Sequence, residues 1–359
     1  MTVFGIAGSM ALLLAGFGLR DSVSNIVAYQ FGELYQYGLT IGFETEGADL
    51  EKIENEVLSG GEAEEMLFMA SKTMDAAHDG KKMSVSLMVP RETDQLSEYI
   101  ILRNRLTHEA VPFDDSGVLL TEKAAGELGV SAGDSIELRE GETQSHAVRV
   151  SGIIENYAHH YVYISPDLYG KTFGGEPEYN SALVKTGELT KDQRDAYSSR
   201  LLAAGDIGLV NFTEDLMETF SDMIETLSLV VMVLIVSAGA LALLILYNLT
   251  NINVSERFRE IATIKVLGFY DREVLSYVYR ENFILAGIGM VLGIFLGMLL
   301  HTYIITTVEV NAVMFGRTIN HLSFVYSCAL TILFALLVNW MMYFKLKKID
   351  MVEALKTVE

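Results

Sequence analysis

Four long apolar segments, separated by polar ones, dominate the pattern of side chains along the chain. Three of them, 226–255, 282–308 and 318–344, carry no Asp, Glu, Lys or Arg. A fourth uncharged stretch covers residues 1–19. Because a bilayer core needs about 20 apolar residues in a helix, the pattern predicts four membrane-spanning helices. The alternative, buried core helices of a large soluble protein, is disfavoured by three uncharged runs of this length.

The first apolar segment is diluted by four glycines and begins at residue 1 with no Lys or Arg before it. A cleaved signal peptide requires a basic region and a small-residue cleavage site, so we interpret this segment as a retained span. Its basic cytoplasmic flank is then expected to lie upstream. The sequence is accordingly expected to be a fragment, or one half of a longer protein, with a truncated gene product as the alternative.

The short loops predict the orientation of the spans. Segment 255–281 has five Lys or Arg and the tail from Lys345 has four, whereas the connection 309–317 has one. Basic short loops face the cytoplasm. The N-terminus is therefore expected inside, and the long polar block between the first two spans is expected outside the membrane.

This polar block carries the whole net charge of -21. Residues 21–220 hold 36 acidic and 15 basic side chains, and the remainder holds 11 of each. The acid excess excludes a nucleic-acid binder. The simplest role of these acidic side chains is to keep the surface of the block solvated. The alternative is that they attract cationic peptides. The single Cys328 allows no intrachain disulfide, so the block must be stable through its own core.

Short alternating segments with turn residues between them predict strands at 39–44, 83–89, 99–103, 135–139, 146–154, 181–185 and 207–212. Helical patterns cover 51–79, 121–128 and 191–204. A further helix is predicted from Thr213, with Glu214 and Asp215 in its first turn, running unbroken into the second span.

The predicted fold is thus a membrane α-helical protein with four transmembrane helices and a large α+β extracytoplasmic domain inserted between the first and second helices. The predicted order is span 1 (1–19), the extracytoplasmic domain (20–220), span 2 (221–250), a cytoplasmic helix and turn (251–281), span 3 (282–308), a short outer loop (309–317), span 4 (318–344) and a cytoplasmic tail (345–359).

Nothing in the block predicts catalysis or a metal site. Residues 169–172, Tyr-Gly-Lys-Thr, share the end of a phosphate-binding loop but lack its first glycine. His159 and His160 are adjacent, and neighbouring side chains of a strand point to opposite faces, so they are expected to be a surface pair. No nucleophile elbow, HExxH or CxxC pattern occurs. We therefore expect no enzyme activity and no cofactor in this chain.

The segment SERFREIATIKVLG, residues 255–268, predicts a charged helix that continues the second span. Charged pairs at i,i+3, such as Glu256 with Arg259, stabilise such a helix by about 0.2–0.5 kcal/mol each. Gly268 suits the end of this helix and Asp271 the N-cap of the next. We interpret this helix, turn and helix as a rigid cytoplasmic knob, with an ordinary interhelical turn as the alternative.

In the third span, Gly289, Gly293 and Gly297 recur every four residues. This spacing strips one helix face of side chains, so that a partner helix can approach closely. Packing within this chain and dimerisation with a second, similar unit fit the spacing equally well.

The segment 255–268, SERFREIATIKVLG, closely resembles the signature of FtsX/MacB-type ABC-transporter permeases, in which Glu-Arg-x-x-Glu-Ile is followed by a Lys or Arg and a Leu-Gly turn. The tail KKIDMVEALK, residues 347–356, is similar to that family too, with Met351 where a Pro often stands. So is the order of one span, a large domain and three further spans. The chain looks like one unit, the C-terminal one, of such a permease.

The resemblance implies a multi-pass permease of the bacterial cell membrane that is not itself an ATPase. A partner dimer of ABC ATPase subunits would bind ATP and grip the knob, and a second permease unit and membrane lipids would complete the assembly. Mechanotransmission would then export or extract an amphiphile, such as a peptide, lipoprotein or antibiotic. The alternative is a membrane-anchored sensor or scaffold without transport. The residues implied in ATPase coupling are Ser255, Glu256, Arg257, Arg259, Glu260, Lys265, Gly268 and Asp271.

Overall fold

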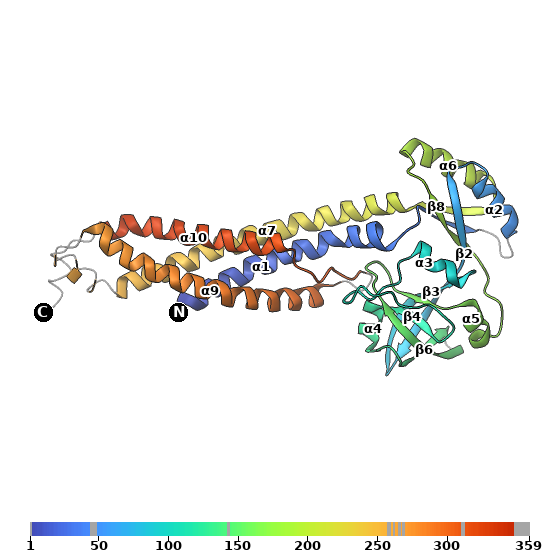
Figure 1. The fold of residues 1–359 in the computed structure, drawn as a ribbon, viewed down its shortest axis with the longest axis horizontal. Helices are drawn as coiled ribbons and strands as arrows, with labels where there is room; N and C mark the ends of the chain where they lie inside the picture. The colour runs from blue at the N-terminus through green and yellow to red at the C-terminus, as the bar shows by residue number, and fades with distance from the viewer. Residues whose placement is uncertain are drawn as a thin grey trace. The chain divides into compact units, whose positions relative to one another are not determined.

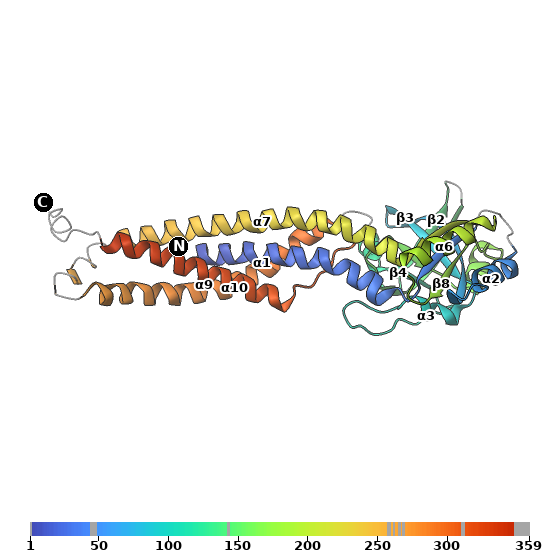
Figure 2. The same cartoon turned by 90° about the horizontal axis from the view of Figure 1, so that it is seen from above.

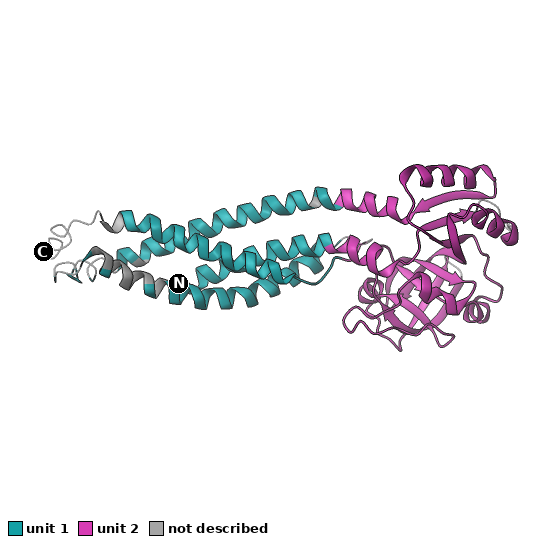
Figure 3. Ribbon diagram, turned by 45° about the horizontal axis from the view of Figure 1, so that its top comes forward, with its two compact units in different colours: residues 1–24, 224–309, 315–359 teal, residues 25–223, 310–314 magenta. Residues whose placement is uncertain are grey.

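The structure is a computed structural model, and it describes residues 2–43, 49–141, 144–256, 260, 263–264, 267, 270–309 and 313–347 (Figure 1). The chain divides into two compact units (Figure 3). Unit 1 comprises Met1–Ser24, Ile224–Glu309 and Phe315–Glu359. Unit 2 comprises Asn25–Met223 and Val310–Met314.

Unit 1 is helical. Its helices belong to α1 (Thr2–Val27), α7 (Thr213–Glu256), α9 (Asp271–Val308) and α10 (His321–Lys347), which run alongside one another in two perpendicular views (Figures 1 and 2). In the described part of the chain, four helices are long and apolar enough to cross a membrane. They coincide with the four apolar segments of the sequence, so the prediction of four such helices is confirmed.

Helix α1 continues well past residue 19. After Val27 the chain forms a π-helix, η1 (Ala28–Leu34), before it reaches the first strand. The charged pair Arg20 and Asp21 does not end the helix. Asp21 instead accepts a hydrogen bond from the backbone N–H of Asn320 at 2.9 Å, just before α10.

Unit 2 contains a nine-stranded sheet in the order β3-β7-β4-β6-β5-β2-β8-β1-β9. Its strands are β1 (Leu39–Phe43), β2 (Ala63–His78), β3 (Lys81–Pro90), β4 (Val118–Thr121), β5 (Ser135–Glu140), β6 (Gln144–Ile154), β7 (Tyr161–Tyr163), β8 (Ser181–Thr186) and β9 (Ile207–Phe212). Its helices are α2 (Leu50–Leu58), η2 (Thr93–Gln95), α3 (Leu96–Tyr99), α4 (Glu122–Leu128), α5 (Pro166–Phe173) and α6 (Lys191–Ala203).

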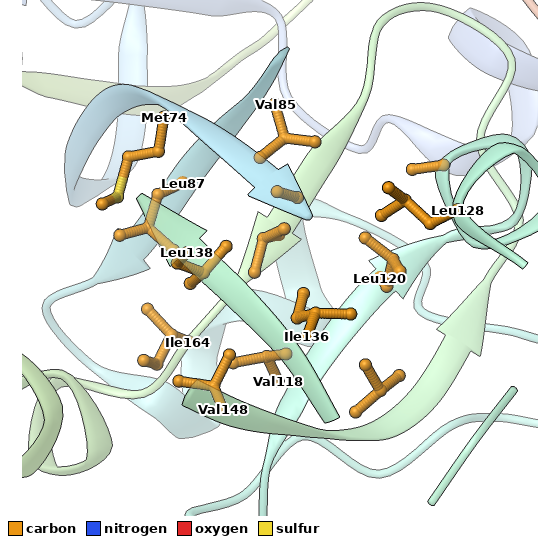
Figure 4. Packing of buried hydrophobic residues seen from close by; sticks show 14 of the residues in the cluster. Met74, Val85, Leu87, Val118, Leu120, Leu128, Ile136, Leu138, Val148 and Ile164 are labelled. Atoms are coloured by element: carbon orange, nitrogen blue, oxygen red, sulfur yellow. The ribbon is translucent and has the colours of Figure 1, made fainter. Parts of the chain in front are cut away.

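Part of this sheet closes into a barrel. Strand β3 pairs with β7 on one side and with β2 on the other, so β3, β7, β4, β6, β5 and β2 form a ring. All six strands contribute buried apolar side chains to one cluster, including Met74, Leu87, Leu120, Leu138 and Val148 (Figure 4). These inward side chains fill the barrel, and closure removes the exposed edges that an open sheet would have.

The first half of β2 leaves the barrel and pairs with β8, which extends the sheet through β1 to β9. Helices α2 and α6 cover one face of this extension. Ile53 and Val57 from α2 and Tyr197 and Leu201 from α6 are buried in a second cluster with strand residues such as Ile41. The two clusters make unit 2 an α+β structure, as predicted.

Six of the predicted strands and two of the predicted helices are confirmed: β1, β3, β5, β6, β8, β9, α4 and α6. The start of α7 at Thr213 and its unbroken course to Glu256 are also as predicted. Strands β4 and β7 and helix α5 were not predicted. They are short, and β4 and β7 form the barrel wall next to each other.

Two of the elements predicted in unit 2 are wrong. The helix predicted over 51–79 ends at Leu58, and Gly61, with φ +79°, begins the turn into the 16-residue strand β2. Tertiary pairing decides this case, because β2 pairs with β3, β5 and β8. The strand predicted over 99–103 is absent: α3 ends at Tyr99, and only isolated bridges at Ile100 and Arg103 follow.

Candidate coupling site

The first turn of α7 is fixed directly to the sheet of unit 2. Strand β9 ends at Phe212 and α7 begins at the next residue. The backbone N–H of Thr213 donates to Gly38 O at 2.9 Å, and its hydroxyl donates to Tyr37 O at 2.9 Å. Thr213 is buried. No flexible linker therefore separates the sheet from this helix.

A charged clamp holds the same turn from the side. The guanidinium of Arg194, on α6, contacts the carboxylates of Glu214 and, at 3.1 Å, Asp215, and it donates to Leu189 O at 3.2 Å. The Arg194 side chain is only 8% exposed, while both acids are half-exposed. Acids in a first helical turn are also favoured by the helix dipole. We call Thr213, Glu214, Asp215 and Arg194 the α7 anchor.

We expect Arg194→Met to loosen the α7 anchor while keeping most of the apolar packing of the side-chain stem. Because both acids are half-exposed, the loss should be about 1–2 kcal/mol of unit 2 stability. Hydrogen exchange of the amides of residues 214–218 should accelerate. Arg200→Met is the matched control, since Arg200 lies on the same helix and pairs with Glu62 at an exposed position. Equal exchange in the two variants would contradict the anchor.

A second anchor holds η1. The side chain of Gln30 is fully buried and donates through Nε2 to Asn156 Oδ1 at 3.0 Å. Its Oε1 accepts from the backbone N–H groups of Tyr157 at 2.7 Å and Ala158 at 3.2 Å. One side chain of the helix thus satisfies two buried backbone donors of a loop that is distant in sequence.

Next to Gln30, an ion-pair network adds to this anchor. Arg103 bonds to Glu155 and to Glu33 of η1, each at 2.6 Å, and Tyr157 donates to Glu155 at 2.5 Å. Hydrogen bonding to Glu155 raises the pKa of Arg103. Burial, followed by the bond to Glu155, raises the pKa of Tyr157. The network therefore stays charged at Arg103 and protonated at Tyr157 at physiological pH. We call Gln30, Glu33 and their partners the η1 anchor.

The residues implied in ATPase coupling lie elsewhere, at the other end of α7. Ser255 and Glu256 end this helix and are exposed, and the Ser255 hydroxyl donates to Asn251 O at 2.8 Å. Glu260 is helical and exposed. Arg257, Arg259, Lys265 and Gly268 lie outside the described residues, as does the side chain of Asp271. The coupling role of these residues stays a prediction.

The start of α9 differs from the predicted one. Asp271 is the first residue of the helix and Tyr270 is its N-cap, so the assignment of Asp271 as N-cap is wrong. The carboxylate of Glu273 accepts a hydrogen bond from the backbone N–H of Tyr270 at 2.9 Å. This bond from the third helical residue back to the N-cap is one half of a capping box. The helix therefore starts at Asp271, one residue earlier than it would if Asp271 were the N-cap.

The glycines of α9 face α1 of the same chain, within unit 1. A Cβ at Gly289 would lie 2.8 Å from Ile6 Cβ, one at Gly293 2.5 Å from Met10 Cβ, and one at Gly297 2.9 Å from Leu14 Cδ2. Farther along, the imidazole of His301 and the hydroxyl of Ser22 are 2.9 Å apart and buried. The glycine face is thus occupied by α1.

The other chemical motifs of the sequence do not form sites among the described residues. Gly170, Lys171 and Thr172 lie inside α5, which Ser165 caps and Gly174 ends, so they do not form a phosphate-binding loop. No group of three or more His, Cys, Asp or Glu in the described ranges could hold a metal ion. Sequence reasoning missed Gln30 and Arg194. Gln30 has a local signal, because it is a polar side chain in an apolar segment, whereas Arg194 lies among the polar residues of α6 and has none.

Residues 232–351 match the family model described as FtsX-like permease C-terminal. This part of the chain is similar to the C-terminal domain of FtsX-like permeases. It includes the membrane part of α7, the charged loop, α9 and α10. The resemblance that the loop signature carried is therefore confirmed over these residues.

A curated relative is an uncharacterized ABC transporter permease of Methanocaldococcus jannaschii, 26% identical over 183 residues. The match covers 48% of this chain and 44% of that protein, so the chain spans less than half the length of the relative.

Two solved structures are similar to part of the chain, with low TM-scores. The periplasmic region of MacB from Actinobacillus actinomycetemcomitans is 12% identical, with a TM-score of 0.36, over 54% of this chain and 97% of that one. The extracellular domain of the noncanonic ABC-type transporter YknZ from Gram-positive bacteria is 18% identical, with a TM-score of 0.32, over 48% and 98%.

Proposed function

We propose that the chain is a permease subunit of an ABC transporter that works by mechanotransmission. ATP hydrolysis by a partner ATPase dimer would act on the charged loop after Glu256, and α7 would carry the movement to unit 2. The observation that carries this proposal is the 44-residue helix α7, which begins in the α7 anchor and ends at the loop. The proposed result is export or extraction of an amphiphilic substrate.

The length of α7 supports this role. At 1.5 Å per residue the helix is about 66 Å long, roughly twice the thickness of a bilayer core. Its first 13 residues contain five acids, including Glu218, Asp222 and Glu225, and are too charged for lipid. The following uncharged run exposes large apolar side chains such as Leu229, Val236 and Leu244, as lipid contact requires. One continuous helix can therefore connect an aqueous domain to the opposite membrane surface.

The two anchors explain how a pull on a helix would become a change in unit 2. A stiff helix transmits displacement only when its end is fixed, and Arg194 and Thr213 fix the end of α7 to α6 and the sheet. The η1 anchor fixes the end of the first helical segment to the loop at Tyr157. We propose that the barrel and the helices α2 and α6 move with these anchors, while a second permease unit, the same or homologous, supplies the other half of the assembly.

The charge pattern of the loop supports a partner on the cytoplasmic side. Its five basic residues favour the inside location, and the acidic unit 2 is then proposed to be extracytoplasmic. Hydrolysis is assigned to the partner ATPase, and the family assignment of residues 232–351 supports that division of labour. The bacterial cell membrane is the proposed location.

The topology can be tested by cysteine labelling in a Cys328→Ser background. Glu260→Cys should be protected from a membrane-impermeant maleimide in intact cells and react after permeabilisation. Glu188→Cys, exposed in unit 2, should react in intact cells. Labelling of Glu260→Cys from outside would overturn the proposal.

The coupling role is tested by reversing the charges at Arg257, Arg259 and Glu260 together. We expect the ATPase partner to lose its response to the permease, because the surface that it grips changes sign, while membrane insertion stays normal. Arg91→Glu, an exposed reversal in unit 2, is the control. ATPase coupling that survives the triple reversal, or purification without any ABC ATPase, would favour the sensor or scaffold alternative.

A further inference from the structure

Unit 2 contains a cavity that none of the roles above uses. It has a volume of about 270 Å³, and it lies against the face of the β8-β1-β9 sheet opposite helices α2 and α6. Thr40, Leu183 and Asn211 line it, whereas their neighbours Ile41, Val184 and Phe212 belong to the cluster beneath those helices. Its aromatic and helical walls include Phe31, Tyr35, Tyr37, Tyr161, Leu216 and Phe220.

The walls of this tyrosine cavity are preformed by ring contacts. The rings of Phe31 and Phe220 have centroids 5.4 Å apart, and those of Tyr35 and Tyr37 are 4.9 Å apart. On β7, the ring centroids of Tyr161 and Tyr163 are 5.9 Å apart. Because the Phe31–Phe220 contact joins η1 to α7, this wall of the cavity is built by packing between two elements and does not depend on a single loop.

The chemistry of the cavity contrasts with the rest of unit 2. The residues that line it include the imidazole of His159 but no Asp, Glu, Lys or Arg, although residues 21–220 contain 36 acids. Burial raises the pKa values of Tyr35, Tyr37, Tyr161 and Tyr163, so their hydroxyls remain neutral hydrogen-bonding groups. An apolar space with a few polar groups and no fixed charge is the usual composition of a site for a small uncharged ligand.

We infer that the tyrosine cavity binds a small, uncharged amphiphile. Its apolar body would lie against Phe31, Leu216 and Phe220, and its hydroxyl or amide would bond to the hydroxyls of Tyr35 and Tyr37. A charged ligand would lose its hydration without gaining an opposite charge. The volume corresponds to about nine water molecules at about 30 Å³ each, and so to a ligand about as large as an alkylphenol. This inference does not depend on the proposed transport function.

Because of the position of the cavity, a bound ligand would affect the contact between η1 and α7. Phe31 lies in η1, and Phe220 is the eighth residue of α7. Both side chains line the cavity. A bound ligand would fill the space between these two helical segments and stabilise the arrangement in which they contact each other. The cavity can therefore act as a site where a small amphiphile restrains the two anchored helix ends.

The binding test uses the full chain in lipid nanodiscs with a photoreactive diazirine derivative of 4-propylphenol. After irradiation and proteolysis, mass spectrometry should find adducts in peptides that contain residues 31–40 or 211–220, and excess 4-propylphenol should remove them. Leu216→Trp fills the cavity and should reduce these adducts about tenfold. Leu202→Trp, an exposed change on α6, should leave them intact.

A second, shape-preserving variant keeps the test decisive if Leu216→Trp impairs folding. Tyr35→Phe with Tyr37→Phe retains the rings and removes two hydroxyls. Competition by 4-propylphenol should then weaken about tenfold, to the level of propylbenzene, because the hydrogen bond is lost. Adducts confined to the membrane helices, or a preference for the phenol that persists in the double variant, would overturn the inference.

Discussion

Replacing Gly293 with leucine is expected to disrupt the contact between α9 and α1. A Cβ at this position would lie 2.5 Å from Met10 Cβ and 2.8 Å from the carbonyl oxygen of Ala7. The backbone oxygen cannot move aside as a flexible side chain could, so the helices must separate. We expect a loss of about 3 kcal/mol, together with early thermal unfolding of the full chain in nanodiscs.

Gly287→Leu is the matched control for this change. Gly287 lies on the same helix, six residues away, and a Cβ there has no neighbour within 4 Å. The control changes hydrophobicity and helix propensity in the same way without the overlap, so its stability should stay within about 0.5 kcal/mol of the natural chain. Similar melting of the two variants would show that the glycine face is not a close contact with α1.

Replacing Gln30 with alanine is expected to release the η1 anchor. The substitution removes the acceptor for the buried backbone N–H groups of Tyr157 and Ala158 and the donor to Asn156. Each orphaned buried donor costs about 1–3 kcal/mol, so the total loss should be about 2–5 kcal/mol. Hydrogen exchange should show faster exchange at residues 156–158 before the barrel is affected.

Gln36→Ala supplies the control for Gln30. Gln36 is exposed, and its single side-chain bond reaches Glu33 O at 2.7 Å on the surface. We expect a change below about 0.5 kcal/mol. If Gln30→Ala also leaves exchange at Tyr157 and Ala158 unchanged, then the loop is held by other contacts and the η1 anchor is not a mechanical connection.

These two changes address different parts of the proposed mechanism. Gly293 tests whether the membrane helices of unit 1 pack as one body, and Gln30 tests whether unit 2 is fixed to its helical connection. A permease that transmits force requires both properties. Loss of ATPase coupling with intact binding of the partner is the functional result that we expect from Gln30→Ala.

The spacing of the glycines in the third span predicts a feature of one helix, but it does not predict which helix packs against it. Four-residue spacing in the third span predicts a smooth helix face. It does not identify the helix that packs there, since α1 and a second permease unit satisfy the same spacing. Only the positions of Ile6, Met10 and Leu14 in the folded chain identify α1 as the neighbour.

Local signals determined several parts of this protein. Three uncharged runs of 27 residues or more and a fourth of 19 can be stable only in lipid or a large core, so the number of candidate membrane helices follows from composition. The start of α7 follows from Thr213, Glu214 and Asp215, whose preferences for a helix N-terminus are local. The family signature in residues 255–268 is likewise continuous in sequence.

Tertiary structure alone decided the rest. Residues 63–78 have a pattern compatible with a helix, and they form a strand because three other strands pair with them. The partners of Gln30 and Arg194 are up to 128 residues away, and the walls of the tyrosine cavity come from residues between Phe31 and Phe220. Such contacts depend on packing between distant segments, which no window of local sequence contains.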